Sequence, residues 1–383
     1  MLVAPILFGT SGVVMGVLNA RQHFFLPALA PSLVNLSLIG AASLLASRMG
    51  IRALALGYAV GAALHLAVQL PGLARVRARY TPLLIRHPGV REVAWLMAPR
   101  VLGLAAVQVN FLVNTNIASR LGEGAVSALN YAWLLMLLPQ GVFAQGVATA
   151  AFPTFADQAA RGDREGMRHT LAGTLRAVLF VILPAAVGLI LLRRPVVALL
   201  FERGAFQAAS TEAVAWALAF YALGLVGHAG VEILARAFYA LHDTWTPVWV
   251  GILAMGLNVL FSLTLPAAFT AGGMAPHGGL ALANSVATLL EMVGLLLLLR
   301  PRLGGLEEVA LRGAALRTGL ATAGMAVALA AWERVAGDGP ALRAGGGGIL
   351  VGAGVYLAAA VVLGADELRA VARVLLQRGP PAS

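Results

Sequence analysis

The sequence contains no cysteine and no lysine, and it has few charged residues of any kind. All 27 of its basic residues are arginine, and charged residues make up only 11% of the chain. Without cysteine, disulfides, thiolate metal sites and thiol nucleophiles are excluded. A soluble domain carries roughly a quarter charged residues. The low charge content therefore argues against a soluble protein.

Long apolar runs take the place of the missing charges. Hydrophobic residues make up 60% of the chain, and the mean hydropathy is +0.86. The runs are about 20 residues long, which matches the hydrocarbon thickness of a bilayer. We therefore expect an all-α, polytopic integral membrane protein with about 11 transmembrane helices. The predicted spans are 2–20, 26–47, 53–74, 93–117, 124–152, 175–192, 211–234, 246–267, 278–299, 315–333 and 346–364.

The arginines indicate how these spans are oriented. A net charge of +11 would suggest nucleic-acid binding in a soluble protein, but here the arginines lie mostly at the ends of apolar runs. If the loop after the first span is inside, about eighteen arginines lie inside and about eight outside. This distribution predicts an outside N-terminus, a cytoplasmic C-terminus and no nucleic-acid partner. Because residues 1–20 lack the positive start of a signal peptide, we expect that preceding helices are missing.

Polar residues at membrane depth are costly, so they are the first candidates for function. The span 93–117 is the richest in them and is followed by a second polar span, 124–152. Arg100 could either extend to the interface or line a cavity. The amides could either join helices or line that same cavity. The polar side chains of the two spans are Arg100, Gln108, Asn110, Asn114, Thr115, Asn116, Asn130, Tyr131, Gln140, Gln145 and Thr149.

Other spans carry fewer polar groups. His228, Glu232 and Arg236 follow one another at intervals of four residues, which indicates a Glu–Arg pair or a proton relay. Two later spans contain Asn258, Ser262, Asn284, Ser285 and Glu291. The sequence has no HExxH, GxSxG or P-loop motif, so we do not expect an enzyme.

Five strings, in this order, resemble the MviN/MurJ family of lipid II flippases, which belong to the MATE-like transporter superfamily. Each string is short, but their order and their spacing relative to the spans are specific. They cover nearly the whole chain. The strings are LNARQHFFLPALAPSLVN from residue 18, NYAWLLMLLPQGVFAQGVATAAFP from residue 130, LFERGAF from residue 200, RAFYALHDTWTP from residue 236, and GLALA from residue 279, with Ser285 shortly after.

The resemblance implies a MATE-like two-lobe bundle with a truncated N-lobe that lacks the first three or so helices. Residues 1–80 would be the remaining half of the N-lobe, with three helices, and 81–92 a basic cytoplasmic linker. Residues 93–300 would form the six-helix C-lobe. Residues 301–383 would form two extra C-terminal helices and a cytoplasmic tail.

The function implied by the resemblance is flipping of lipid II, the lipid-linked peptidoglycan precursor, by alternating access in the bacterial inner membrane. The partners would be membrane lipid and a lipid-linked oligosaccharide pyrophosphate, and the protein would be a monomer. Two alternatives stay open. One is a related exporter or flippase of another substrate, such as a drug antiporter or a polysaccharide-lipid flippase, and the other is a non-transporting remnant or scaffold.

The site residues follow from the same resemblance. The substrate-cavity candidates are Arg100, Asn110, Asn114, Tyr131, Gln140 and Gln145. The candidates for a sodium site are Asn114, Asn258 and Ser285, and no other cofactor is expected. The chain departs from the family where an Asp-Arg pair follows Tyr-Ala, because it has Trp133 and Leu134 there. That departure removes an arginine suited to binding pyrophosphate.

Overall fold

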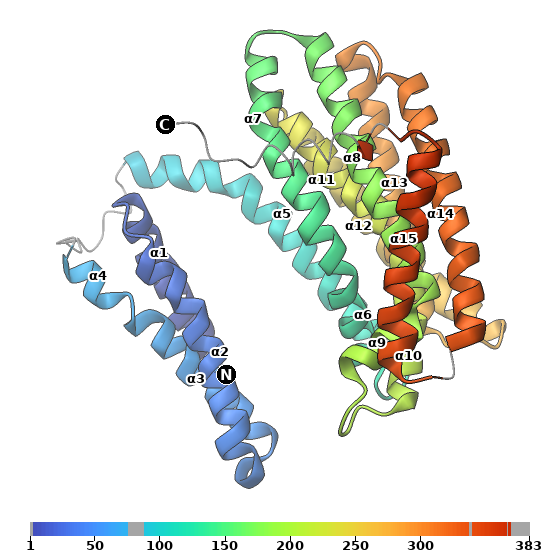
Figure 1. The fold of residues 1–383 in the computed structure, drawn as a ribbon. Coiled ribbons are helices and arrows are strands. Elements are labelled where there is room, and N and C mark those ends of the chain that lie inside the picture. Colours follow the sequence, from blue (N-terminus) through green and yellow to red (C-terminus); the bar gives the residue numbers. More distant parts are fainter. Residues whose placement is uncertain (1–2, 76–87, 337–338, 366, 369–383) are drawn as a thin grey trace, which may run out of the picture. The chain divides into compact units, whose positions relative to one another are not determined.

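Helices make up nearly all of the part of the chain that the computed structural model describes, which is residues 3–75, 88–336, 339–365 and 367–368 (Figure 1). No strand occurs among these residues, which confirms the all-α prediction. The chain divides into two units, Met1–Trp95 and Leu96–Ser383. The linker predicted at 81–92 and the predicted tail lie largely outside the described residues.

The first unit is built on close packing between small residues. Its helices are α1 (Val3–Ala20), α2 (Phe25–Met49), α3 (Ile51–Ala67) and α4 (Leu70–Arg75). Gly50 joins α2 to α3 with a φ of 55°, which glycine adopts without strain. On α3, Gly57 lies so close to α2 that an added Cβ would be 2.5 Å from Ala41 Cβ. Such close approach is how helices associate in lipid.

A buried polar cluster joins α1 to α3. Ser11 Oγ lies 2.7 Å from His65 Nδ1, and Gln69 Nε2 donates to Ser11 Oγ at 2.7 Å. All three side chains are buried. His65 therefore has a structural role, because its ring nitrogen is bonded within the unit.

The second unit contains the other helices, with α5 beginning in the first unit. They are α5 (Pro88–Ser119), α6 (Ala125–Pro139), η2 (Gln140–Gln145), α7 (Gly146–Ala160), α8 (Arg164–Leu191), α9 (Arg193–Phe201), α10 (Ala208–Leu223), α11 (Leu225–Ala240), α12 (Trp245–Ala271), α13 (His277–Leu303), α14 (Glu308–Ala336), η3 (Leu342–Gly347) and α15 (Gly348–Val362).

The apolar core of this unit has three parts. One part lies among α7, α8, α11 and α13 and includes Phe155 and Phe238. A second lies between α6 and α10 and includes Leu218. The third packs α14 and α15 onto α8, where the Tyr356 hydroxyl donates to the Phe180 carbonyl at 2.5 Å. Helices α14 and α15 are thus attached to the rest of the second unit through α8.

Two spans are interrupted. Helices α6 and α7 are joined by the π-helical turn η2, which directly follows Pro139; proline and π-turns are common causes of irregularity in helices. Helices α10 and α11 bend by 44° at Gly224. An added Cβ on Gly224 would lie 2.7 Å from Ser285 Cα, so glycine allows α13 to approach the bend.

Helices occupy all eleven predicted ranges, but the number of spans is smaller by length and apolarity. Within the described residues, nine helices are long and apolar enough to cross a membrane, or ten if the bent pair α10–α11 is one span. Helix α5 is not among them. The predicted count of about 11 is therefore not confirmed, whereas the polytopic membrane class is.

A charged cluster lies where α11 turns into α12. Asp243 accepts hydrogen bonds from the Thr246 backbone at 2.9 Å and hydroxyl at 2.6 Å. It also pairs with Arg302, whose guanidinium lies 5.0 Å from the centre of the Phe238 ring. Burial opposes the charge, but the Thr246 bonds and Arg302 lower the pKa of Asp243 from 3.8 to about 2.

Replacing Gly279 with alanine should separate α12 from α13. An added Cβ there would lie 2.8 Å from the Leu265 carbonyl carbon and from the Pro266 nitrogen. We expect Gly279→Ala to lower the free energy of unfolding by about 1–3 kcal/mol. The control is Gly256→Ala on α12, where an added Cβ meets no atom within 4 Å. Thermal unfolding of the purified variants in detergent tests this, and equal midpoints would contradict it.

Asp243→Asn should remove a pH-dependent part of the stability. Because the folded pKa lies below the unfolded value, the carboxylate stabilises the fold above about pH 4, and this contribution is lost as the pH falls through 2. We expect the variant to be less stable than wild type near neutral pH and to respond less to acid. Thermal midpoints measured across this pH range check it. Asp157→Asn, at the exposed pair with Arg161, should leave the acid response unchanged.

Candidate functional site

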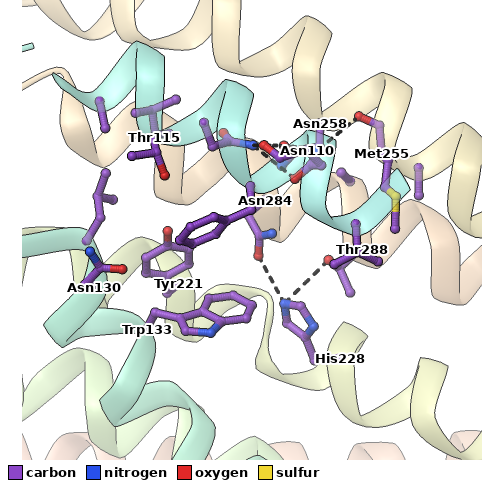
Figure 2. A pocket seen from close by; sticks show the side chains of 18 of the residues that line it. Asn110, Thr115, Asn130, Trp133, Tyr221, His228, Met255, Asn258, Asn284 and Thr288 are labelled. Atoms are coloured by element: carbon purple, nitrogen blue, oxygen red, sulfur yellow. Dashed lines mark hydrogen bonds between the residues drawn. The ribbon is translucent and has the colours of Figure 1, made fainter. Parts of the chain in front are cut away.

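A cavity of about 410 Å³ lies within the second unit, between α5, α6, α10, α11, α12 and α13. Its wall is unusual for the interior of a membrane bundle because amides, hydroxyls and an imidazole stand among the apolar side chains. Figure 2 shows these groups pointing toward a shared space. The polar and aromatic lining residues are Asn110, Phe111, Asn114, Thr115, Asn130, Trp133, Tyr221, His228, Asn258, Asn284, Thr288 and Glu291.

Three asparagines and a serine join α5 to α12 on one side of the cavity. Asn258 Oδ1 accepts hydrogen bonds from Asn110 Nδ2 at 3.0 Å and from Asn114 Nδ2 at 2.8 Å. Ser262 Oγ donates to Asn114 Oδ1 at 2.8 Å. Asn258 is buried, and its Nδ2 has no partner within the described part of the chain. The cluster therefore contains one buried donor that the described residues leave unpaired.

His228 and two aromatic rings form the opposite side. His228 Nε2 lies 3.1 Å from Asn284 Oδ1 and 3.5 Å from Thr288 Oγ1, as Figure 2 shows. The Trp133 ring packs edge-on against His228 and Tyr221, with centroids 5.4 and 5.3 Å apart. This wall combines flat apolar rings with hydrogen-bonding groups, as sites for sugars and amides do.

Comparisons with known proteins agree with this architecture. The family model described as lipid II flippase MurJ matches residues 1–337. The chain belongs to the MurJ family. A lipid II flippase MurJ from Burkholderia cenocepacia is 37% identical over 75% of this chain and 56% of its own length. A probable lipid II flippase MurJ from Bdellovibrio bacteriovorus is 30% identical over 94% of this chain and 69% of its own.

Two solved structures share the fold. A structure titled lipid II flippase MurJ in an inward closed conformation has a TM-score of 0.78 at 24% identity, covering 95% of this chain and 73% of that one. A MATE protein in its straight conformation has a TM-score of 0.51 at 16% identity, covering 78% and 67%. The MurJ resemblance predicted from the sequence is thus confirmed. The chain spans little more than half of the Burkholderia relative.

The cavity of this MurJ family member contains only part of the predicted site. Asn110 and Asn114 line it. Tyr131 instead packs against Phe201 and Phe206, with ring centroids 4.9 and 5.5 Å away. Of the remaining candidates, Gln140 is buried in η2, Gln145 is exposed, and the side chain of Arg100 lies outside the described part of α5. The role of each stays a prediction.

The three sodium-site candidates do not come together as an oxygen cage. Ser285 donates to the Phe220 carbonyl at 2.6 Å, beside the bend at Gly224, and does not line the cavity. The side-chain oxygens of Asn114 and Asn258 already accept hydrogen bonds. A cation site prefers carboxylate or free carbonyl oxygens. The candidate residues therefore do not fit a sodium ion in this arrangement.

Nine of the polar and aromatic cavity residues were absent from the predicted site. Three of them, Asn284, Thr288 and Glu291, have a signal in the sequence, because residues at positions i, i+4 and i+7 share one face of a helix. The others include Trp133, Tyr221 and His228. Their position depends on which helices are neighbours, so their placement had no such signal.

Asn258→Leu tests whether the amide cluster holds α5 to α12. Leucine has a similar size but removes Asn258 Oδ1, the side-chain acceptor that the Asn110 and Asn114 amides share. We expect a loss of about 1–2 kcal/mol in the free energy of unfolding. The control is Asn130→Leu, which changes an exposed cavity amide that has no hydrogen bond among the described residues. Chemical unfolding in micelles measures both, and a wild-type value for Asn258→Leu would contradict the role of the cluster.

Proposed function

We propose that this protein moves lipid II across the bacterial inner membrane. The observation that carries the proposal is the match of the MurJ family model to residues 1–337. A polar cavity inside a bundle of membrane spans supports it, because such a cavity can shelter a hydrophilic headgroup while the polyprenyl tail stays in lipid. Alternating access of the cavity to the two sides would complete the transfer.

The proposed division of roles follows from the chemistry of the wall. Trp133 and Tyr221 offer flat rings to the apolar faces of sugars, while Asn130, Asn258 and Asn284 offer hydrogen bonds to hydroxyl and amide groups. No arginine is among the described residues that line this cavity. This cavity would therefore bind the sugars or peptide of the substrate, and the pyrophosphate would bind outside it.

The remaining sequence predictions belong to this proposal. Arg100 would be an anion ligand, and Tyr131, Gln140 and Gln145 would contact substrate in another state of the cycle. The first unit would act as the N-lobe, residues 81–92 as the cytoplasmic linker, 93–300 as the C-lobe and 301–383 as the extra helices and tail. The C-terminus would face the cytoplasm, and the protein would work as a monomer.

Reconstitution with labelled lipid II tests this function directly. The full chain is placed in vesicles with lipid II on one face, and an enzyme added to the other face cleaves only molecules that have crossed. We expect cleavage to exceed that of protein-free vesicles. Asn130→Leu should reduce the rate about fivefold, since one substrate hydrogen bond is worth about 1 kcal/mol.

The matched control is Leu134→Ala, on the same helix but exposed and outside the cavity lining. It should transport like wild type. Vesicles that show no crossing of lipid II but expel a small organic cation would contradict the proposal and favour a drug exporter. A chain that folds and moves neither substrate would favour a scaffold.

A further inference from the structure

Glu291 is a carboxylate in the middle of a membrane span. It lies near the midpoint of α13, half-buried. Among the described residues it makes no hydrogen bond and no ion pair. Its carboxylate rests against the backbone of α12 at Gly251, where an added Cβ would be 3.3 Å from Glu291 Oε1. A charged carboxylate without a partner is costly at this depth in a membrane span. The presence of Glu291 at this position therefore needs an explanation.

Two cavities meet at this side chain. The first is the cavity described above. The second, of about 440 Å³, is lined by Phe152, Val231, Glu232, Ala235, Arg236, Tyr239, Pro247, Glu291 and Leu295. Among the described lining residues, Glu291 is the one that lines both cavities.

The cavities lie on opposite sides of Glu291 along the helices. On α13, the first cavity is lined by residues before Glu291, up to Thr288, and the second by Leu295 after it. On α11, His228 lines the first cavity, and the residues that line the second begin at Val231. Helix α12 shows the reverse order, with Pro247 in the second cavity and Asn258 in the first. The carboxylate thus lies between two cavities, one toward each end of the spans.

Among the residues whose side chains the structure describes, no cation partner is left for Glu291 around these cavities. The titratable groups that line them are His228 and Tyr221 in the first, and Glu232, Arg236 and Tyr239 in the second. Arg236 is bonded to Glu232 Oε1 at 2.5 Å and to Thr149 Oγ1 at 3.2 Å. Helix α12 adds no titratable side chain to either wall.

A metal cation is a poor alternative. The described lining of the first cavity contains no second carboxylate, and Glu232 in the second is paired with Arg236. No group of three potential metal ligands of the His, Cys, Asp or Glu type occurs in the part of the chain that the structure describes. Hard cations need several oxygen ligands. A proton needs only the carboxylate itself.

We propose that Glu291 is a proton-binding site that exchanges its proton with water in either cavity. The carboxylate takes a proton from a hydronium ion in one cavity, which leaves water, and returns it to a water molecule in the other. No electron is transferred and no co-reactant is needed. The two cavities give the site access toward both ends of the spans, as a coupling site requires.

Labelling with dicyclohexylcarbodiimide tests the site without any transport substrate. This reagent adds to protonated carboxyl groups in apolar surroundings and stays attached, so peptide mass spectrometry locates it. With the purified full chain in detergent, we expect an adduct on Glu291 at neutral pH that is lost as the pH rises. Glu232, which is paired with Arg236, should stay unlabelled.

Glu291→Gln keeps the shape of the side chain but cannot bind a proton, and it should abolish the adduct. The matched control, Glu232→Gln on the second cavity, should keep it. An unlabelled Glu291 throughout the pH range would overturn the proposal. Protection by sodium but not by choline at equal concentration would also overturn it, in favour of a cation site. Because no lipid II is present, failure here is distinguishable from failure of the proposed flippase function.

Discussion

The constraint on which the structure depends is that a polar group in hydrocarbon must find its partner within the protein. Two polar groups of the structure illustrate this constraint. Ser285 bonds the Phe220 carbonyl beside the bend between α10 and α11, and Ser11 and Gln69 bond each other and His65 within the first unit. Asn258 Nδ2 has no hydrogen-bond partner among the described residues. The Glu291 carboxylate makes no hydrogen bond or ion pair within the same part of the chain, and both residues line the cavity. These unpaired polar groups in the cavity are therefore the first candidates for function.

The parts of the fold that depend on local sequence could be predicted. A run of about 20 apolar residues has to be a helix in lipid, so helices occupy all the predicted ranges. The Glu232–Arg236 pair also followed from sequence, because residues four apart meet on one helix whatever surrounds it. Family membership came from short strings in a fixed order, which needs no knowledge of contacts.

The site was harder to predict because it depends on how each helix is rotated and which helices are neighbours. Asn130 and Tyr131 are adjacent in sequence, yet Asn130 lines the cavity while Tyr131 packs against Phe201. Ser285 and Asn284 differ in the same way, since only Asn284 faces the cavity. A polar residue in a span indicates that a hydrogen-bonding partner is needed. The sequence does not show whether that partner is a backbone carbonyl, another side chain or a substrate.

The joint between α5 and α12 is built from amides and one hydroxyl, without any formal charge. The energy that a membrane potential supplies to a conformational change depends on the charge that moves across the field. The hydrogen bonds of this joint can break and re-form without moving any formal charge across the membrane. The residues that make them are Asn110, Asn114, Asn258 and Ser262. Breaking the bonds of this joint therefore contributes nothing to a voltage dependence, and any electrical dependence of the protein has to come from its charged and titratable side chains.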